Sequence, residues 1–238
     1  MSLYVIADLH LATADASKSM EVFGKRWLNY IEKLNNNWRR VISDNDTVII
    51  PGDISWGLTT SDARQDLLWL DSLPGKKVIL KGNHDFWWST VSKLNAFFEE
   101  NKITSISVIN NNAIELEGKI LAGSRGWFTD KSMQNAEENV DYDKIVNREA
   151  IRLEMSLAQA EALRGESDKE ILVFLHFPPV WSDFACQPIL EVLKKHKISK
   201  CYFGHIHGSY SLPDSFEFEN ISFSLISADF LDFMPKIL

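Results

Sequence analysis

The segment Lys77–Asp85 reads KVILKGNHD, a short apolar run that ends abruptly in Gly, Asn, His and Asp. Short apolar runs bounded by glycine and polar residues are typical of buried β-strands. In open α/β sheets, ligands bind in the crevice beyond the carboxyl ends of the strands. We therefore expect a strand over Lys77–Leu80 and the chemistry of the protein at the residues that follow it.

Four further apolar runs end in the same way. They are Leu3–Ala7 before Asp8 and His10, Thr47–Ile50 before Asp53, Ile171–Leu175 before His176, and Lys200–Phe203 before His205 and His207. Of the six histidines in the chain, five follow these runs, counting His84. If the five strands run in the same direction, their polar ends converge on a single site.

The side chains at these strand ends are suitable ligands for two metal ions. The seven candidate ligands are Asp8, His10, Asp53, Asn83, His176, His205 and His207. Imidazole and oxygen donors without a thiolate favour Mn, Fe or Zn. Seven donors are too many for one tetrahedral ion, whereas two divalent ions that share a carboxylate use them all, and such a pair attracts a phosphate ester and activates water.

The spacing within the candidate ligands supports a compact site. Asp8 and His10 are two residues apart, as are His205 and His207. On an extended segment, residues i and i+2 point to the same side, so both side chains of each pair are expected to face the site. Glycines beside the ligands, such as Gly52 and Gly82, allow sharp turns and a close approach of the backbone to an ion.

The rest of the chain alternates strand-like and helix-like patterns, which predicts an α/β sandwich with two sheets face to face and helices outside. A further strand is expected at Ile120–Ala122, and Ile106–Ile109 with Ala113–Leu116 predicts a hairpin. No helix is expected after Gly208, and Ser124–Asn139 is expected to be a loop near the site. Three apolar stripes predict helices: Met20, Phe23, Trp27, Ile31 and Leu34; Ala63, Leu67 and Leu70; and Ile151, Met155, Ala158 and Ala162.

Composition indicates one folded domain over residues 1–238. An apolar fraction of 45% and a charged fraction of 24% exclude a disordered chain, a collagen and a disulfide scaffold. The formal net charge of −8 disfavours general binding to the backbone of duplex nucleic acid.

Several absences in the sequence suggest a cytoplasmic protein. Cys186 and Cys201 form no CxxC pair and are expected to be reduced thiols. The sequence contains no run of 18 apolar residues, so no membrane span is expected. The first ten residues have no basic region and too short an apolar run for a signal peptide.

The ordered blocks D-x-H, G-D, G-N-H-D, H and G-H-x-H, spread over Asp8–His207, resemble the calcineurin-like metallophosphoesterase superfamily. The resemblance implies a four-layer α/β/β/α sandwich of two mixed β-sheets flanked by helices, with the metal site at the carboxyl ends of the strands. It also implies that Asp53 bridges the two ions, that His84 faces the phosphate, and that Asp85 orients His84. The remaining ligands divide into Asp8, His10 and His207 for one ion and Asn83, His176 and His205 for the other.

One departure bears on the substrate. Protein serine/threonine phosphatases of this superfamily carry Arg-Gly soon after the G-D block, where this chain has Ser55-Trp56-Gly57. The expected activity is therefore hydrolysis of phosphate mono- or diesters of a small molecule or nucleotide by a metal-bound hydroxide. The alternatives are a protein serine/threonine phosphatase and a non-catalytic scaffold with the same fold.

Three residues are candidates for substrate binding. Arg125 is able to grip a phosphate bidentately, although a surface salt bridge is the simpler interpretation. Trp56 and Trp127 are candidates for a rim that stacks an aryl or nucleobase group, with core packing as the alternative. Trp87, Trp88 and Trp181 also lie near the metal blocks, whereas Trp27, Trp38 and Trp69 are expected in the core. His196, in a Lys-rich stretch, is expected at the surface.

Overall fold

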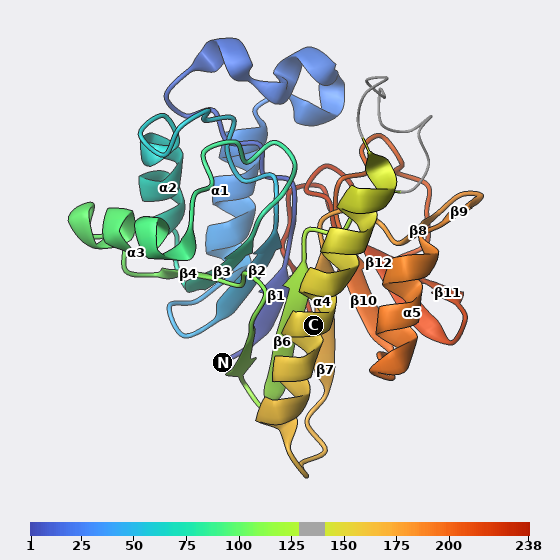
Figure 1. Ribbon diagram of the computed structural model, residues 1–238. Coiled ribbons are helices and arrows are strands. Elements are labelled where there is room, and N and C mark those ends of the chain that lie inside the picture. Colours follow the sequence, from blue (N-terminus) through green and yellow to red (C-terminus); the bar gives the residue numbers. More distant parts are fainter. Residues whose placement is uncertain (129–140) are drawn as a thin grey trace.

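A computed structural model describes residues 1–128 and 141–238, and its architecture is an α/β sandwich of two mixed sheets flanked by helices. Helices α1 (Tyr30–Val41), α2 (Arg64–Asp71) and α3 (Val91–Glu100) cover one sheet (Figure 1). Helices α4 (Tyr142–Arg164) and α5 (Gln187–Lys195) cover the other. The predicted fold class is thereby confirmed.

The first sheet has the order β13-β1-β2-β3-β4 and is parallel except for β13. Its strands are β1 (Leu3–Val5), β2 (Thr47–Pro51), β3 (Lys76–Leu80), β4 (Ile106–Val108) and β13 (Lys236–Ile237). The second sheet has the order β11-β12-β10-β7-β6-β5, with antiparallel pairs at both edges. Its strands are β5 (Ala113–Leu116), β6 (Lys119–Ser124), β7 (Ile171–Leu175), β10 (Lys200–Phe203), β11 (Phe216–Phe218) and β12 (Ile221–Leu225). A small hairpin pairs β8 (Val180–Trp181) with β9 (Phe184–Ala185).

Three hydrophobic clusters fill the three interfaces of the four layers. On β7, Leu172 and Phe174 point into the space between the sheets, whereas Val173 and Leu175 point toward α4 and α5. Because both faces of the strand are buried, its sequence is a continuous apolar run rather than an alternating one. The same two-sided burial on β2 and β3 explains why the strands that carry the predicted ligands were recognisable from their sequence.

The predicted hairpin between Ile106–Ile109 and Ala113–Leu116 is wrong. β4 pairs in parallel with β3 in the first sheet, and β5 pairs with β6 in the second. Residues 109–112 therefore cross from one sheet to the other. Two short apolar runs beside an Asn-rich turn fit a hairpin equally well, so the tertiary partners decide the pairing.

Two of the predicted helical stripes are also corrected. The stretch from Met20 to Leu34 is divided into 3-10 turns η2 (Met20–Phe23) and η3 (Lys25–Trp27), followed by α1. Gly24 and Asn29, with φ of 120° and 53°, interrupt the helix. A third 3-10 turn, η1 (Ala16–Lys18), precedes them.

Helix α4 is present, but its buried face is not the predicted one. Ile151 and Met155 are 62% and 53% exposed, whereas Leu153 and Leu157 are buried against the sheet. Because Ala and Leu are distributed around the whole helix, the sequence pattern did not indicate which face of α4 is buried.

His196 is buried rather than exposed. Its ring nitrogens lie 3.1 Å from a carboxylate oxygen of Glu154 and 3.0 Å from one of Glu161. Both partners lie on α4, so His196 ties the end of α5 to its neighbour.

Other predictions concern the cysteines, the ends of the chain and the loop. Cys186 and Cys201 are free and buried. No helix is described after residue 208. Within the described ranges, no helix is both long and apolar enough to span a bilayer. Of the predicted loop Ser124–Asn139, Ser124 ends β6, residues 125–128 have no regular structure, and residues 129–139 lie outside the described part.

Candidate metal centre

The predicted ligands gather in two groups beyond the carboxyl ends of β1, β2, β3, β7 and β10. Potential ligand atoms of Asp8, His10 and His207 lie within 4.8 Å of one another. Those of Asp53, His176 and His205 form a second group with the same spacing. Five strand ends distributed over both sheets thus place their polar residues together.

Asn83 belongs with the second group, and Asp53 links that group to the first. Asn83 Oδ1 lies 2.7 Å from His176 Nε2 and 3.0 Å from His205 Nδ1. Asp53 Oδ2 lies 3.4 Å from His176 Nε2 and 3.7 Å from His10 Nε2. One oxygen of Asp53 therefore lies between a histidine of the second group and a histidine of the first.

The hydrogen bonds around the histidines leave lone pairs facing one another, which fits a bound cation. Nδ1 of His176 donates to the Pro51 carbonyl at 3.1 Å, so in the neutral ring Nε2 directs its lone pair at the Asn83 oxygen. Nδ1 of His207 lies 2.8 Å from Asp229 Oδ1, and its Nε2 faces His10 Nε2 at 3.3 Å. Among the described residues, the buried Asp8 Oδ1 has no hydrogen-bond partner. Donors arranged in this way fit divalent metal ions.

The pKa values of the histidines differ with their surroundings. Burial lowers the pKa of His10 to about 3 and that of His205 to about 2, so both rings are neutral and able to act as ligands. Burial also disfavours charge on His176, but the carboxylates of Asp53 and Asp8 outweigh it and raise its pKa to about 9.

The carboxylates are perturbed as well. Burial raises the pKa of Asp8 to about 6, against the opposing effect of His176 and His207. Burial acts on Asp53 in the same sense, but nearby His176 and His10 hold the pKa of Asp53 below its ordinary value. Of these two carboxylates, Asp53 is therefore the one whose ionised form the neighbouring histidines stabilise more.

Four of the predicted ligands have left-handed backbone conformations. The φ angles of Asp8, His10, Asp53 and His205 are 59°, 45°, 52° and 69°. The expectation that Asp8–His10 and His205–His207 are extended segments is therefore wrong. Asp and His tolerate this region better than most residues, and such conformations cluster at functional sites. Here they turn the ligands into the site while Leu9 remains fully buried in the core.

Glycines allow the ligand loops to contact each other. A Cβ atom added at Gly82 would overlap Asp53, and one at Gly52 would overlap Gly82 and the His176 ring. Gly52 also has φ of 94°, where a side chain is strained. The loops that carry Asp53 and Asn83 are thus in contact at positions that admit no side chain.

The side chain of Asp85 connects these two loops through hydrogen bonds. Its Oδ2 accepts hydrogen bonds from the backbone N–H groups of Asp53 (2.9 Å) and Gly82 (2.8 Å). Its Oδ1 accepts from Ile54 N at 2.9 Å and Trp87 Nε1 at 2.9 Å. None of the described hydrogen bonds of Asp85 reaches the His84 ring.

His84 lies half-buried beside the first group. Its backbone N–H donates to Asp53 Oδ1 at 2.8 Å, and its ring centroid lies 5.7 Å from that of His10. Burial lowers the pKa of His84. Its side chain is therefore neither fully enclosed nor among the two groups of ligand atoms.

The three candidate substrate-binding residues differ in their surroundings. Trp56 is half-buried and stacks on His10, with ring centroids 4.9 Å apart, and lies 4.5 Å from the His84 ring. Arg125 NH2 lies 3.1 Å from Glu149 Oε1, and its guanidinium lies 4.5 Å from the centroid of the Trp127 ring. Trp127 also packs on Phe177 at 4.4 Å.

The other tryptophans belong largely to the packing. Trp87 is buried and hydrogen-bonded to Asp85, so it does not form part of an open rim. Trp27 and Trp38 are buried in the core as predicted, and Trp69 packs against it half-buried.

Two residues that support the ligands were not found from the sequence. Asp229, fully buried, accepts from His207 Nδ1 and from Gly208 N at 3.0 Å. It follows the apolar strand β12 just as the predicted ligands follow theirs, and that signal was available. The hydroxyl of Tyr30 donates to the His10 carbonyl at 2.6 Å, and no sequence motif marks it.

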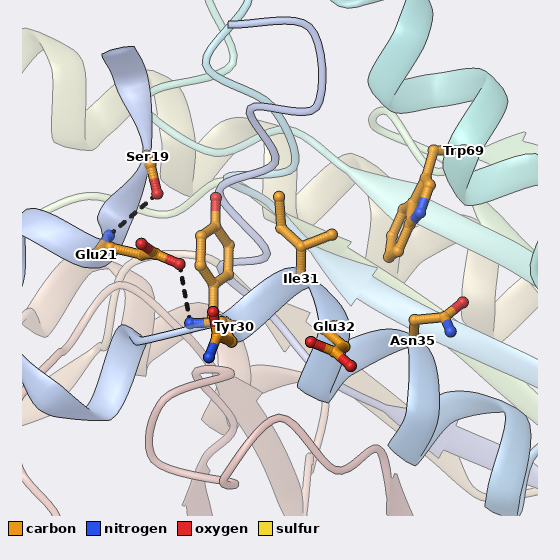
Figure 2. A pocket seen from close by; sticks show the side chains of 8 residues that line it. Ser19, Glu21, Tyr30, Ile31, Glu32, Asn35 and Trp69 are labelled. Atoms are coloured by element: carbon orange, nitrogen blue, oxygen red, sulfur yellow. Dashed lines mark hydrogen bonds between the residues drawn. The ribbon is translucent and has the colours of Figure 1, made fainter. Parts of the chain in front are cut away.

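Tyr30 also borders a separate cavity of about 520 Å³, which Figure 2 shows between the η2 segment and α1. Ser19 Oγ accepts from Glu21 N there, and a Glu21 carboxylate oxygen accepts from Asn29 N. None of the seven predicted metal ligands lines this cavity. The chemistry predicted from the sequence therefore lies elsewhere.

Comparison with known proteins assigns the family. A family model described as calcineurin-like phosphoesterase matches residues 1–209. No curated protein matches the chain. A solved structure of a protein of unknown function from Aquifex aeolicus is similar, with 17% identity and a TM-score of 0.49 over 99% of this chain and 95% of that chain. Because the family model spans most of the sequence, from before Asp8 to beyond His207, this chain belongs to the calcineurin-like phosphoesterase family.

Proposed function

We propose that residues 1–238 form a single domain that acts as a dinuclear metal-dependent phosphohydrolase on phosphate mono- or diesters of a small molecule or nucleotide. The observation that carries the proposal is the position of Asp53, whose Oδ2 lies 3.7 Å from His10 Nε2 and 3.4 Å from His176 Nε2. A carboxylate placed between two groups of ligands is what a pair of ions requires. Family membership supports a phosphoesterase in general.

The chain offers a separate set of ligands for each ion. Asp8, His10 and His207 would hold one ion, Asn83, His176 and His205 the other, and Asp53 both. The mixture of imidazole and oxygen donors favours Mn, Fe or Zn. When bound, two such ions supply positive charge and an activated water for attack on phosphorus.

Residues around the ligands complete the proposed site. His84, half-buried beside His10, would donate a proton to the leaving oxygen. Asp85 is a positioning residue that acts through the backbone of the Asp53 and Gly82 loops. Trp56 presents an aromatic face beside His10 and His84 on which an organic leaving group would stack.

A protein phosphatase is the second candidate and has less support. At the place of the Arg-Gly element, the Ser55 hydroxyl is buried and donates to Asp66, and Trp56 packs on two histidines. Neither side chain supplies a cation for a phosphoprotein. A non-catalytic scaffold does not need all seven ligands, whereas this chain keeps them and His84.

Asp53→Asn should lower metal binding more than any other single ligand replacement, because Asp53 serves both ions. Elemental analysis after loading with Mn²⁺ should give two ions per wild-type chain and at most one for the variant. Asp66→Asn is the matched control, since Asp66 is also a buried carboxylate but hydrogen-bonds to Thr13 and Ser55. A wild-type stoichiometry of one, with Asp53→Asn unchanged, would contradict a shared carboxylate.

Asp229→Asn should weaken binding of Mn²⁺ roughly 10- to 100-fold, because the residue fixes the orientation and basicity of the His207 ring. Titration of metal-free protein with Mn²⁺ measures the effect. Asp232→Asn, at an exposed carboxylate three residues away, is expected to bind like wild type. Equal affinities for all three proteins would show that Asp229 has no part in the site.

His84→Ala should retain both metal ions and lose turnover by roughly 10²- to 10⁴-fold, the usual contribution of a general acid. The loss should be smaller for nitrophenyl phosphate, because nitrophenolate leaves readily without protonation. His196→Ala is the control, since His196 lies between Glu154 and Glu161 outside the site. Loss of metal in parallel with activity would instead make His84 a ligand.

Substrate preference should favour nucleotides and aryl esters over phosphopeptides and plasmid DNA. Trp56→Ala should lower kcat/KM for aromatic substrates roughly tenfold, equivalent to about 1.4 kcal/mol of lost stacking. Trp69→Ala, at a half-buried tryptophan on α2, serves as the control. The proposal fails if phosphopeptides or DNA are preferred more than about tenfold, or if Trp56→Ala with full metal content matches wild type on every aromatic substrate.

A further inference from the structure

A cavity of about 400 Å³ lies beside the metal centre, between the ends of β3 and β6, the start of α3 and one face of α4. None of the seven predicted metal ligands lines it. It is nevertheless close to them along the chain. Lys81, in its wall, immediately precedes Gly82 and Asn83, and the carbonyl of Arg125 accepts hydrogen bonds from the backbone N–H groups of His176 (3.1 Å) and Phe177 (2.9 Å).

The charge of this cavity is opposite to that of the protein. Its charged lining residues are Lys81, Arg125, Arg148, Arg152 and the carboxylate Glu149. Four cations thus face one anion in a chain whose formal net charge is −8. Such a local excess of positive charge attracts anionic ligands to the cavity.

The three arginines converge on one atom. Glu149 Oε1 lies 2.6 Å from Arg152 NH1, 3.1 Å from Arg125 NH2 and 3.9 Å from Arg148 Nε. Each guanidinium has five N–H donors, so one carboxylate oxygen leaves most of them unused. Among the described residues, the buried Arg125 Nε has no hydrogen-bond partner.

The crowding of these cations also costs energy. Four cationic side chains line the cavity with the single carboxylate of Glu149, so most of their positive charge has no partner in the lining. An anion in the cavity would reduce the repulsion among these cations and accept hydrogen bonds from their unused N–H groups. Guanidinium forks match the oxygens of a phosphate group in geometry and charge.

We propose that this cavity is an anion subsite that binds a second phosphate group of the substrate, apart from the phosphate that is hydrolysed. The inference rests on the proposed function for the identity of that substrate, a small molecule or nucleotide with two phosphate groups. Lys81 and Arg125 connect the subsite to the metal centre. Lys81 follows β3, as the ligand Asn83 does, and Arg125 follows β6, the parallel neighbour of the strand β7 that precedes His176. Arg148 and Arg152 close it from α4.

Arg148→Gln and Arg152→Gln test the subsite, with Arg164→Gln in the last turn of α4 as the control of equal charge. The Arg148 side chain is 52% exposed and 3.9 Å from Glu149, so its replacement leaves the packing of α4 in place. Calorimetric titration of inorganic phosphate, in low salt and with a chelator present, measures binding without the metal ions. Phosphate should bind wild type and Arg164→Gln alike and the other two variants at least fivefold more weakly. Equal binding by all four proteins, or an equal loss in Arg164→Gln, would overturn the subsite.

A second measurement links the subsite to turnover. With Mn²⁺ present, wild type should hydrolyse adenosine 3′,5′-bisphosphate with kcat/KM roughly tenfold above that for adenosine 5′-monophosphate, and Arg148→Gln and Arg152→Gln should lose this preference. A preference absent from wild type, or retained by both variants, would refute the role in substrate binding. If wild type hydrolyses no phosphate ester, the proposed function fails, and the phosphate titration alone decides whether the anion site exists.

Discussion

The candidate site depends on the hydrogen bonds of the Asp85 carboxylate. This carboxylate accepts hydrogen bonds from backbone N–H groups of the loop after β2 and the loop after β3, and from the indole N–H of Trp87. Burial raises the pKa of this carboxyl to about 6, and the nearby Asp53 acts in the same direction, while the amide donors oppose them. A buried carboxylate is tolerable only where donors surround it, and here the donors are the backbone of the two loops that present Asp53 and Asn83.

Hydrogen bonds between strand ends also support the unusual backbone of the ligand loops. Four ligand residues have positive φ angles, and each such conformation costs free energy that the surrounding packing must offset. The offset comes from hydrogen bonds that cross between strand ends: His205 N donates to Asp8 Oδ2 at 2.9 Å, and His84 N donates to Asp53 Oδ1 at 2.8 Å. The predicted ligands are therefore also acceptors that fix one another's loops, so a change at one ligand is expected to disturb its neighbours.

The central strands were predictable from the sequence because strands buried on both faces have continuous apolar sequences. The candidate ligands were predictable because they directly follow the ends of these strands. Features that depend on tertiary partners were beyond the reach of the sequence. The exchange of sheets between β4 and β5, the interruption of the first helical stripe at Gly24, and the inward turn of Leu153 rather than Ile151 are decided by packing. Tyr30 supports His10 through a side chain that no local pattern distinguishes from a core aromatic residue.

The distribution of charge in the molecule affects which anionic ligands are attracted to the candidate site. The chain is acidic overall, yet its imidazoles gather at the strand ends and four cations gather in the adjoining cavity around Glu149. The Debye length is about 8 Å at physiological ionic strength, so the cations of the cavity act on a ligand that reaches them. A long polyanion also meets the rest of a chain whose formal net charge is −8. With metal ions bound as proposed, both sites would be positive, and a small ligand with two anionic groups would meet attraction at each of them. Under the proposed function, we therefore expect the distribution of charge to favour small anionic ligands, independently of any contact with the organic part of the substrate.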